Sequence, residues 1–264
     1  MRSEINPPNP IAFQWQRVGL FAGSLVILLL AFVGVSFLEP PAIPTVSPMP
    51  IVETTTTTLP PSPVPRSTTI AKVAGPLPYS AAPGGEVVGA LPVGKWWGTT
   101  KFLPVIARVP GWLQVRLPQR PNGSTGWISE SSAELSVTPF AILIDVNSFR
   151  LKLYQAGEVV LDFPAGVGTV DDPTPLGDFY VMVIEDSPGP GYGPFLIGTN
   201  AHSEAIQSWQ GSGDAFTAIH GPVGADAAIG TTGGQISHGC VRLHIADLKQ
   251  LDGVPPGAPV VIAE

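Results

Sequence analysis

The chain has 264 residues, of which 44% are hydrophobic and only 12% are charged. That length fits one or two domains, and the apolar content is sufficient for a buried core. Glycine and proline are frequent, at 30 and 31 residues. This composition excludes a coiled coil or a helical bundle and favours a turn-rich β protein with some unstructured linker.

Charge is divided unevenly along the chain, whose formal net charge is −7. Residues 1–138 carry 9 basic and 6 acidic side chains, whereas residues 139–264 carry 4 basic and 14 acidic ones. An acidic surface repels the phosphate backbone of nucleic acids. We therefore expect no nucleic-acid partner.

Residues 18–38 (VGLFAGSLVILLLAFVGVSFL) contain no charged side chain. A helix of this length is about long enough to cross a bilayer core of roughly 30 Å. Arg17 precedes the run and Glu39 follows it, so the positive-inside rule places residues 1–17 in the cytoplasm. A cleaved signal peptide is the alternative, but the apolar run is too long and no cleavage signal follows it. The sequence thus predicts a single-pass membrane protein with an extracytoplasmic head.

Two segments of different character follow the apolar run. Residues 39–69 consist mainly of proline, threonine and serine, which predicts an extended tether of on the order of 100 Å. Residues 70–136 contain short runs of alternating apolar and polar side chains and an Asn122-Gly123 turn signal, which predict a small β module. Its tryptophans are either core residues, which the small size favours, or a ligand-binding aromatic face: Trp96, Trp97, Trp112 and Trp127.

The remaining residues, 139–264, repeat the strand signal. The runs AILIDV, RLKLYQ and EVVLDF are separated by turn residues and predict an antiparallel meander. The only helix signal is the short segment IADLKQL, with Gly253 beyond its end. The sequence predicts a mainly β, antiparallel, sandwich-like domain with one short helix.

Cys240 is the single cysteine, so an internal disulfide is excluded. His238 lies two positions before it, Arg242 two positions after it, and His220 ends a predicted strand. An imidazole that accepts the thiol proton lowers the pKa of the thiol and produces a strong nucleophile. Gly239 lets the backbone approach a substrate closely and direct amides at an oxyanion.

These residue types alone allow three uses of Cys240. It is a catalytic nucleophile, a ligand of zinc together with His220 and His238, or a small buried hydrophobe. Spacing and neighbours, rather than the cysteine itself, must decide between them.

Longer motifs resemble a known family. His220, followed after sixteen residues by Ser237-His238-Gly239-Cys240-Val241-Arg242, resembles the signature of the YkuD-type L,D-transpeptidases. The segments Thr174-Pro175-Leu176-Gly177-Asp178-Phe179 and Tyr192-Gly193-Pro194 resemble further elements of that family. The resemblance covers about residues 139–264. Residues 70–136 resemble bacterial SH3-like barrels, which agrees with wall-located members of the family.

The resemblance implies a peptidoglycan transferase that takes part in cell-wall organisation and cell shape. Cys240 would attack the diaminopimelate to D-Ala bond of a stem tetrapeptide, release D-Ala and pass the acyl group to an amine acceptor. His220 would be general base and then acid, with its ring oriented by the Gly221 carbonyl. The amides of Gly239 and Cys240 would line the oxyanion hole.

The same resemblance implies further roles and partners. Ser237 would fix the turn, His238 would support the site, and Arg242 and Tyr192 would bind substrate, with no metal and no cofactor. A brace between Arg242 and an acid such as Asp247 is the structural alternative. Carbapenems are expected to acylate the thiol.

Other functions remain as alternatives: an L,D-carboxypeptidase on the same stem, a catalytically silent wall-binding scaffold, or a zinc amidohydrolase. The chain departs from the family pattern at Pro222 and His244. Asp214 either positions the strand that ends at His220 or is an exposed loop residue. We expect His202 and His244 to be structural or solvent-exposed.

Overall fold

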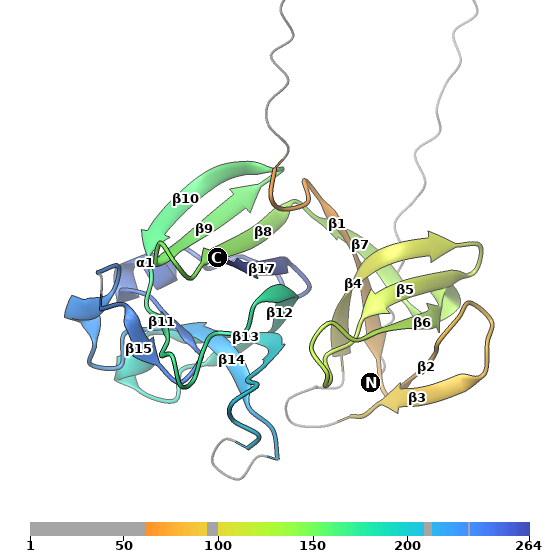
Figure 1. The fold of residues 1–264 in the computed structure, drawn as a ribbon. Coiled ribbons are helices and arrows are strands. Elements are labelled where there is room, and N and C mark those ends of the chain that lie inside the picture. The colour runs from red at the N-terminus through yellow and green to blue at the C-terminus, as the bar shows by residue number, and fades with distance from the viewer. Residues whose placement is uncertain (1–61, 94–99, 209–212, 232) are drawn as a thin grey trace, which may run out of the picture. The chain divides into compact units, whose positions relative to one another are not determined.

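The computed structural model describes residues 62–93, 100–208, 213–231 and 233–264 (Figure 1). The predicted span at 18–38 and most of the predicted tether lie outside the described residues. In the part that is described, no helix is both long and apolar enough to cross a bilayer. Residues 57–264 belong to one compact unit.

The first part of this unit is a seven-stranded antiparallel sheet with the strand order β3-β2-β6-β5-β4-β1-β7. Its strands are β1 (Thr68–Ala74), β2 (Leu77–Ser80), β3 (Val87–Leu91), β4 (Thr100–Val109), β5 (Trp112–Arg116), β6 (Thr125–Ser129) and β7 (Glu134–Thr138), with a 3-10 turn η1 (Glu130–Ser132) between the last two.

The predicted alternation is confirmed in β5, where Leu113 and Val115 are buried and their neighbours are partly exposed. Trp112 and Trp127 are only partly buried, so these two tryptophans do not form the core as their module's size suggested. The apolar residues of β1, β4, β5 and β6 form the core instead. The likeness to SH3 barrels stays a prediction.

The second part is an eight-stranded sheet with the order β10-β9-β8-β17-β12-β13-β14-β16, beside a parallel pair β11-β15. Its elements are β8 (Phe140–Asp145), β9 (Arg150–Gln155), β10 (Glu158–Pro164), β11 (Val167–Gly168), β12 (Gly177–Asp186), η2 (Pro190–Tyr192), β13 (Phe195–His202), β14 (Phe216–His220), η3 (Asp226–Ala228), β15 (Gln235–Ser237), β16 (Val241–Arg242), α1 (Ile245–Lys249) and β17 (Pro259–Ala263).

The predicted meander is confirmed, because β8, β9 and β10 pair in sequence as antiparallel neighbours. The expectation of a wholly antiparallel domain is wrong. β17 runs parallel to β8, and β14 runs parallel to β16. Both parallel pairs join strands that are distant in the chain, since a parallel neighbour requires a long crossover connection and cannot be reached by a tight turn.

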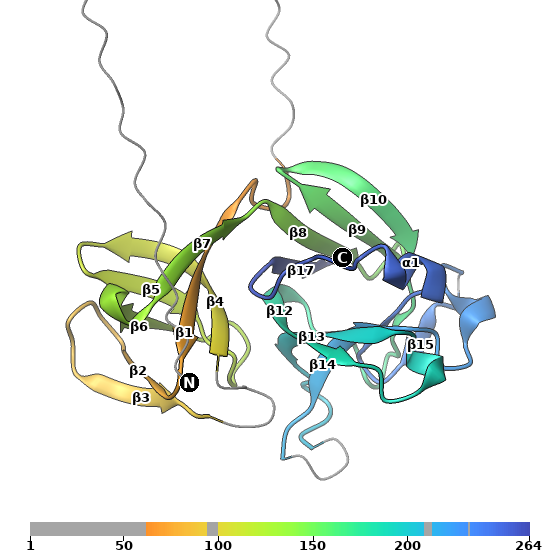
Figure 2. The same cartoon turned by 180° about the vertical axis from the view of Figure 1, so that it is seen from behind.

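One apolar core holds this second part together. β8, β9 and β10 lie on one side of it and β13 and β14 on the other (Figures 1 and 2), which gives the sandwich-like arrangement that the sequence predicts. The short helix α1 is also confirmed and buries Leu248 in the core. Fully or almost fully buried members come from most strands of the sheet: Ile142, Leu151, Val181, Ile197, Ile219, Val241 and Val260.

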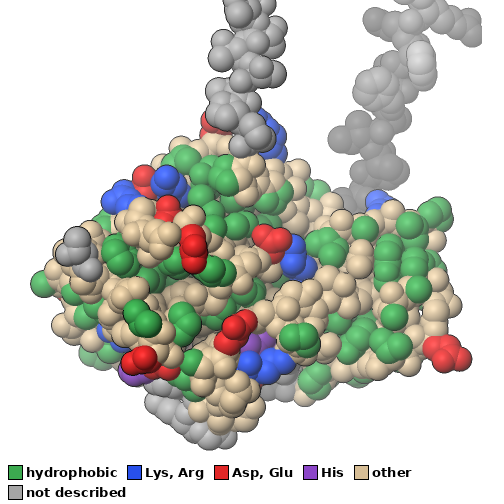
Figure 3. Space-filling view, in the orientation of Figure 1, with side chains coloured by type: hydrophobic (Ala, Val, Ile, Leu, Met, Phe, Trp, Pro, Cys, Tyr) green, Lys and Arg blue, Asp and Glu red, His purple; other side chains and the backbone are tan. Residues whose placement is uncertain are grey.

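Some of the charged side chains on the surface form ion pairs. Figure 3 shows Lys and Arg next to Asp or Glu at several places on the visible face. Ion pairs such as Arg150–Asp162 at 2.9 Å and Arg116–Asp178 at 2.8 Å belong to this surface. Exposed pairs of this kind contribute little stability, about 0–1 kcal/mol each.

Candidate active site

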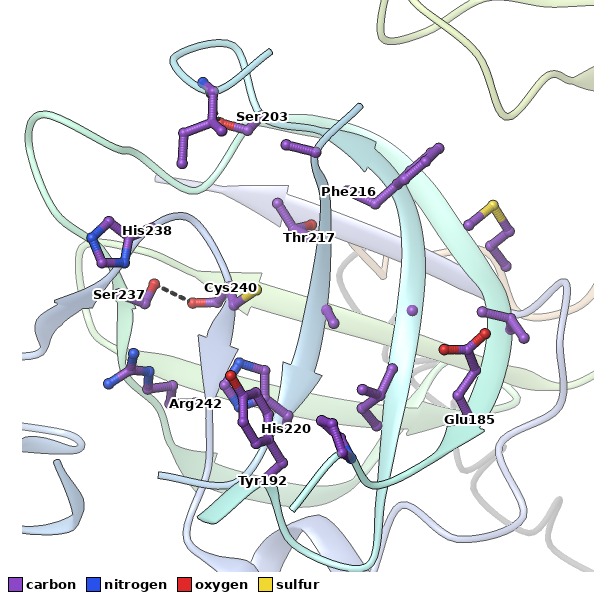
Figure 4. Close-up of a pocket in the computed structure, with 18 of the residues that line it drawn as sticks. Glu185, Tyr192, Ser203, Phe216, Thr217, His220, Ser237, His238, Cys240 and Arg242 are labelled. Atoms are coloured by element: carbon purple, nitrogen blue, oxygen red, sulfur yellow. Dashed lines mark hydrogen bonds between the residues drawn. The ribbon is translucent and has the colours of Figure 1, made fainter. Parts of the chain in front are cut away.

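A pocket of about 710 Å³ opens on the second sheet. His220, Ser237, His238, Cys240 and Arg242 all line it, so the structure brings together the residues that the sequence selected. Figure 4 shows Cys240 and His220 in the same pocket as the ring of Tyr192, with Glu185 on the opposite side.

Strand pairing explains why residues twenty positions apart meet. β14 and β16 are parallel neighbours, with Ile219 opposite Val241 and His220 opposite Arg242. Cys240 directly precedes β16. The sheet register therefore places the cysteine loop beside the end of the histidine strand.

His220 is held in one tautomer by its surroundings. Its Nδ1 lies 2.8 Å from the carbonyl oxygen of Gly221, the contact that the sequence analysis expects. A carbonyl only accepts, so Nδ1 carries the proton and Nε2 keeps a lone pair. Burial lowers the pKa of His220 to about 4, with a further lowering by the charge of Arg242, and the Gly221 bond opposes both. The imidazole is thus neutral and basic at pH 7.

The thiol of Cys240 is also neutral. Cys240 as a residue is partly exposed, yet burial of its thiol raises the pKa, and a backbone hydrogen bond at Ala218 and the charge of Arg242 oppose this only in part. The expected lowering of the thiol pKa by a histidine cation is therefore wrong for this site. Because the pKa of His220 is lowered and that of Cys240 is raised, the two side chains rest as neutral imidazole and neutral thiol, and not as imidazolium and thiolate.

Ser237 shapes the turn that carries the cysteine, as expected. Its hydroxyl donates to the carbonyl oxygen of Cys240 at 2.5 Å and accepts the amide N–H of Gly239 at 3.1 Å; Figure 4 shows the first of these bonds. Because the Gly239 amide is already bonded, the expectation that it lines an oxyanion hole is wrong. The amide of Cys240 remains the candidate donor.

Thr174 braces the same turn from the opposite side, a role that the sequence analysis missed. Its hydroxyl donates to the carbonyl of Gly239 at 3.0 Å and accepts the N–H of Gly168 at 2.8 Å, and it is buried. Gly239 has φ +107°, a conformation that only glycine adopts readily. The sequence indicated Thr174 only as part of a family motif. It did not predict which groups the Thr174 hydroxyl contacts.

Tyr192 packs on the histidine. The two ring centroids are 4.8 Å apart at an interplanar angle of 48°, and the Tyr192 carbonyl accepts the N–H of Gly221 at 2.8 Å. Tyr192 therefore helps to fix His220 and lines the pocket. Its binding of substrate stays a prediction.

Arg242 also lies at the pocket, but its guanidinium forms few hydrogen bonds with the described residues. Nη1 lies 3.4 Å from the Pro222 carbonyl, and Nε is buried without a hydrogen-bond partner. Across the residues that the structure describes, none of the ion pairs includes Arg242. The alternative brace to Asp247 is thus not formed.

His238 stands at the rim of the pocket. Its side chain is 63% exposed and its Nε2 lies 3.8 Å from a carboxylate oxygen of Asp172. Over the described ranges, no group of three or more His, Cys, Asp or Glu side chains is arranged to hold a metal ion. The zinc ligand set of His220, His238 and Cys240 therefore has no support in the geometry.

The other two histidines are structural, as expected. His202 is buried beside Asp214, with 2.9 Å between Nδ1 and a carboxylate oxygen. His244 lies 2.9 Å from Asp226 in the preceding 3-10 turn. Asp214 also accepts the amide N–H of Ala215 at 2.8 Å, so it holds the start of the histidine strand, which is the first of its two predicted readings.

Comparison with known proteins shows what this part of the chain resembles. Residues 139–262 match the YkuD family model, described as the L,D-transpeptidase catalytic domain. Proteins named YkuD from Bacillus licheniformis and Bacillus subtilis are 26% and 28% identical over 118 and 125 residues, which are 45% and 47% of this chain. The matched regions cover 61% and 66% of those relatives.

Among solved structures, a mutant Enterococcus faecium L,D-transpeptidase is 24% identical, with a TM-score of 0.37, and the match covers 47% of this chain and 49% of that one. The family match lies on the same sheet that builds the pocket and contains each of the motif residues described above. Residues 139–262, somewhat less than half of the chain, therefore match the L,D-transpeptidase catalytic domain of the YkuD family.

Proposed function

We propose that the protein is a peptidoglycan L,D-transpeptidase in which Cys240 is the nucleophile and His220 the general base. One observation carries the assignment. A buried, neutral imidazole, with its proton fixed on Nδ1 by the Gly221 carbonyl, stands on the strand beside the cysteine loop and shares its pocket. A neutral imidazole that can accept the thiol proton is what nucleophilic catalysis by a thiol requires, and this observation supports the proposal.

In the first half-reaction, the Cys240 sulfur attacks the carbonyl carbon of diaminopimelate in the stem tetrapeptide while Nε2 of His220 takes the thiol proton. The amide of Cys240 donates to the oxyanion as it forms. Collapse of the tetrahedral intermediate breaks the C–N bond to D-Ala. His220 gives its proton to the leaving amine, and the acyl group remains on sulfur as a thioester.

In the second half-reaction, an amine of another stem attacks the thioester. His220 accepts a proton from that amine and returns one to the departing thiolate, which restores the neutral pair and leaves an amide cross-link. Attack by water in place of the amine would make the enzyme an L,D-carboxypeptidase. The two outcomes share every residue of the first half-reaction.

The neutral resting pair suits this sequence of steps. A thiolate with a strongly lowered pKa is a weaker nucleophile and a better leaving group than one formed during attack. Transfer of the proton within the pocket lets Cys240 react as a strong nucleophile only when a carbonyl is in place. The raised thiol pKa also limits reaction with adventitious electrophiles.

Substrate binding is assigned to Arg242 and Tyr192. The Arg242 guanidinium lies at the pocket, and among the described residues its buried Nε has no hydrogen-bond partner and the guanidinium takes part in no ion pair. A guanidinium accepts a carboxylate through two parallel bonds, and stem peptides carry carboxylates. His238, at the exposed rim, is a supporting residue.

The proposed location is outside the cytoplasm, on a single membrane span at 18–38 with the tether 39–69 before the folded part. The substrate supports this, because peptidoglycan lies outside the membrane. A module at 70–136 resembling SH3 barrels is proposed to bind wall glycan or peptide.

Mass spectrometry of the detergent-purified full chain with disaccharide-tetrapeptides tests the proposal. Release of D-Ala with formation of a cross-linked dimer is expected, and the Cys240→Ala variant must lose both products. Release of D-Ala without dimer would indicate the carboxypeptidase. The absence of both products would favour the wall-binding scaffold, and products that persist in Cys240→Ala but vanish with a chelator would indicate a zinc amidohydrolase.

Carbapenems offer a direct assay of the thiol. Incubation with one equivalent of a carbapenem should add one drug mass to the protein, because its ring carbonyl is an acyl donor for Cys240. Cys240→Ser serves as the matched control and should remain unmodified. An adduct on that variant would contradict the assignment of the nucleophile.

A further inference from the structure

One partly buried cluster of ionisable side chains has no part in the reaction above. Arg120, from the segment between β5 and β6, donates from Nε to a carboxylate oxygen of Asp214 at 3.0 Å. The other carboxylate oxygen of Asp214 lies 2.9 Å from Nδ1 of His202, whose side chain is only 1% exposed. The cluster thus joins a residue of the first sheet to the end of β13 and the start of β14.

Arg120 makes further bonds at the same place. Its Nη2 donates to the carbonyl oxygens of Ser203 at 2.8 Å and Ile206 at 3.2 Å. The planar guanidinium of Arg120 therefore donates to one carboxylate and two carbonyls. These bonds fix the positions of Ser203, Ile206 and Asp214 relative to one another.

Asn122, two residues later, adds a reciprocal pair of bonds. Its Nδ2 donates to the carbonyl of His202 at 2.8 Å, and its Oδ1 accepts the N–H of the same residue at 2.9 Å. The side-chain amide of Asn122 thus bonds both the N–H and the carbonyl of His202, as the backbone of a neighbouring β-strand would. Side chains of the segment 117–124, between β5 and β6, thus bind both backbone and side-chain atoms of the second part of the protein.

The groups held in this way form part of the pocket wall. Ser203, Ile206, Ala215 and Phe216 line the pocket together with Cys240. In Figure 4, Ser203 and Phe216 lie on the side of the pocket away from His220.

Short links connect the cluster to the wall. The Asp214 carboxylate accepts the amide of Ala215 at 2.8 Å, and the Ala215 carbonyl accepts that of Ser203 at 2.8 Å. The ring of His202 packs on that of Phe216 with 4.4 Å between centroids.

The protonation states in the cluster indicate that the ion pair between Arg120 and Asp214 is present at pH 7. Burial would raise the pKa of Asp214, but hydrogen bonds from His202, Ala215 and Arg120 lower it overall, so the carboxylate is ionised at pH 7. Burial lowers the pKa of His202 more than Asp214 raises it. The Asp214 side chain is only 26% exposed, so loss of its guanidinium partner would leave the carboxylate poorly compensated, and the wall depends on Arg120.

We propose that Arg120 and Asn122 are positioning residues of the active site, which fix the pocket wall at Ser203, Ala215 and Phe216 for the acyl-donor peptide. The amino-terminal β module would then be a working part of the enzyme as well as a spacer or wall-binding unit. The inference about peptide binding rests on the proposed function; the inference about the wall does not.

A second ion pair between the same two sheets provides a matched control. Arg116 in β5 lies 2.8 Å from Asp178 at the start of β12. Neither residue lines the pocket. Arg116→Gln therefore removes an inter-sheet ion pair of the same type without touching the wall, and Arg120→Gln removes the one that holds it.

Hydrogen exchange of the full chain tests the wall directly. In Arg120→Gln, the amides of residues 215–217 should exchange at least about tenfold faster than in the wild type, whereas Arg116→Gln should leave them within about twofold. Asn122→Ala should also accelerate amide exchange at residues 215–217, but by a smaller factor. This variant replaces Arg120→Gln in the test if Arg120→Gln does not fold. Equal exchange in the Arg116 and Arg120 variants would overturn the proposal.

Kinetics of the same variants tests the consequence for substrate. Arg120→Gln should raise KM for the tetrapeptide about tenfold with kcat reduced less than about threefold, because the wall contacts the peptide and not the reacting thiol. Alkylation of Cys240 by iodoacetamide should be unchanged. An equal fall of kcat and of the alkylation rate would overturn the role in peptide binding and indicate general damage to the site.

The two sets of results separate the two proposals. If the wild type does not turn over the tetrapeptide, the proposed function fails, and the exchange rates still decide whether Arg120 and Asn122 hold the wall. If turnover occurs but KM in Arg120→Gln equals that in Arg116→Gln, the positioning role in binding fails and the proposed function stands.

Discussion

His220 and Cys240 have pKa values that are moved in directions opposite to those of a preformed ion pair. The same burial that lowers the pKa of the imidazole to about 4 raises that of the thiol. The proton therefore stays on sulfur until a substrate arrives. This property belongs to the individual side chains and gives a clear pH dependence.

The acidic limb of the acylation rate should consequently lie near pH 4 and not near 6.5. His220 must be neutral to accept the thiol proton, and with a pKa of about 4 the active form is lost only below that pH. We expect kcat/KM for carbapenem acylation, measured by stopped-flow absorbance, to be flat from about pH 5 to 8.

The His220→Gln variant is the control for this profile. It should acylate about 10²- to 10⁴-fold more slowly, since general-base catalysis contributes a factor of that size, and it should lack the limb near pH 4. A limb near pH 6.5 in the wild type would contradict the lowered pKa of His220, and an unchanged rate in His220→Gln would move the base role to the exposed His238.

Arg242 provides a second prediction at this scale. If its guanidinium holds a carboxylate of the stem, Arg242→Gln should lose at least about tenfold in kcat/KM on the native stem and little on an amidated one. Arg242→Lys keeps the charge without the planar fork and should recover only part of the loss.

Rates on both stems and melting temperatures decide the question. Because Arg242 forms no ion pair within the described part of the protein, the melting temperature of Arg242→Gln should stay close to that of the wild type. An equal loss on both stems with a lowered melting temperature would show that Arg242 is a brace.

At the scale of elements, the cysteine turn is held between two hydroxyls. Ser237 binds it from within, and Thr174 binds it from the loop before β12. The second contact joins two motifs that are 65 residues apart in the chain. The turn therefore depends on the relative placement of two segments and not on its own sequence alone.

Thr174→Val should test this brace. The substitution keeps the shape of the side chain but leaves the buried N–H of Gly168 and the buried carbonyl of Gly239 without partners, at a cost of about 1–3 kcal/mol each. We expect a lower free energy of unfolding in urea and slower acylation of Cys240.

Thr174→Ser retains the hydroxyl and should stay near the wild type in both measurements. If Thr174→Val acylates at the wild-type rate despite lower stability, the brace supports the fold only and does not set the position of the thiol.

At the scale of the whole molecule, the uncharged run at 18–38 is the basis of the proposal that the folded part lies outside the cytoplasm. If the run spans a membrane, Arg17 before it and Glu39 after it would orient the folded part outward by the positive-inside rule. Protease added to spheroplasts should therefore remove residues 70–264, with a cytoplasmic protein as the control for lysis. Protection of the head in sealed spheroplasts would contradict the orientation.

Sequence patterns predicted much of this architecture because they are local. Alternation of apolar side chains predicted β5 and the meander β8–β10, and the segment after His244 predicted α1. The motif around Cys240 predicted which residues share the pocket. Period-2 patterning and short motifs depend on neighbours within a few residues, so they can be read without the fold.

By itself, then, the sequence predicted a mainly β domain and the residues that share the pocket, and the family resemblance predicted the contact of His220 with its own neighbour, Gly221. Only the tertiary structure decided the parallel pairings of β17 and β14, the engagement of the Gly239 amide, the braces by Thr174 and Arg120, and the pKa shifts of His220 and Cys240. Each of these depends on burial or on contacts between residues distant in the chain. Desolvation and long-range hydrogen bonds exist only once the chain has folded, and no local pattern encodes them.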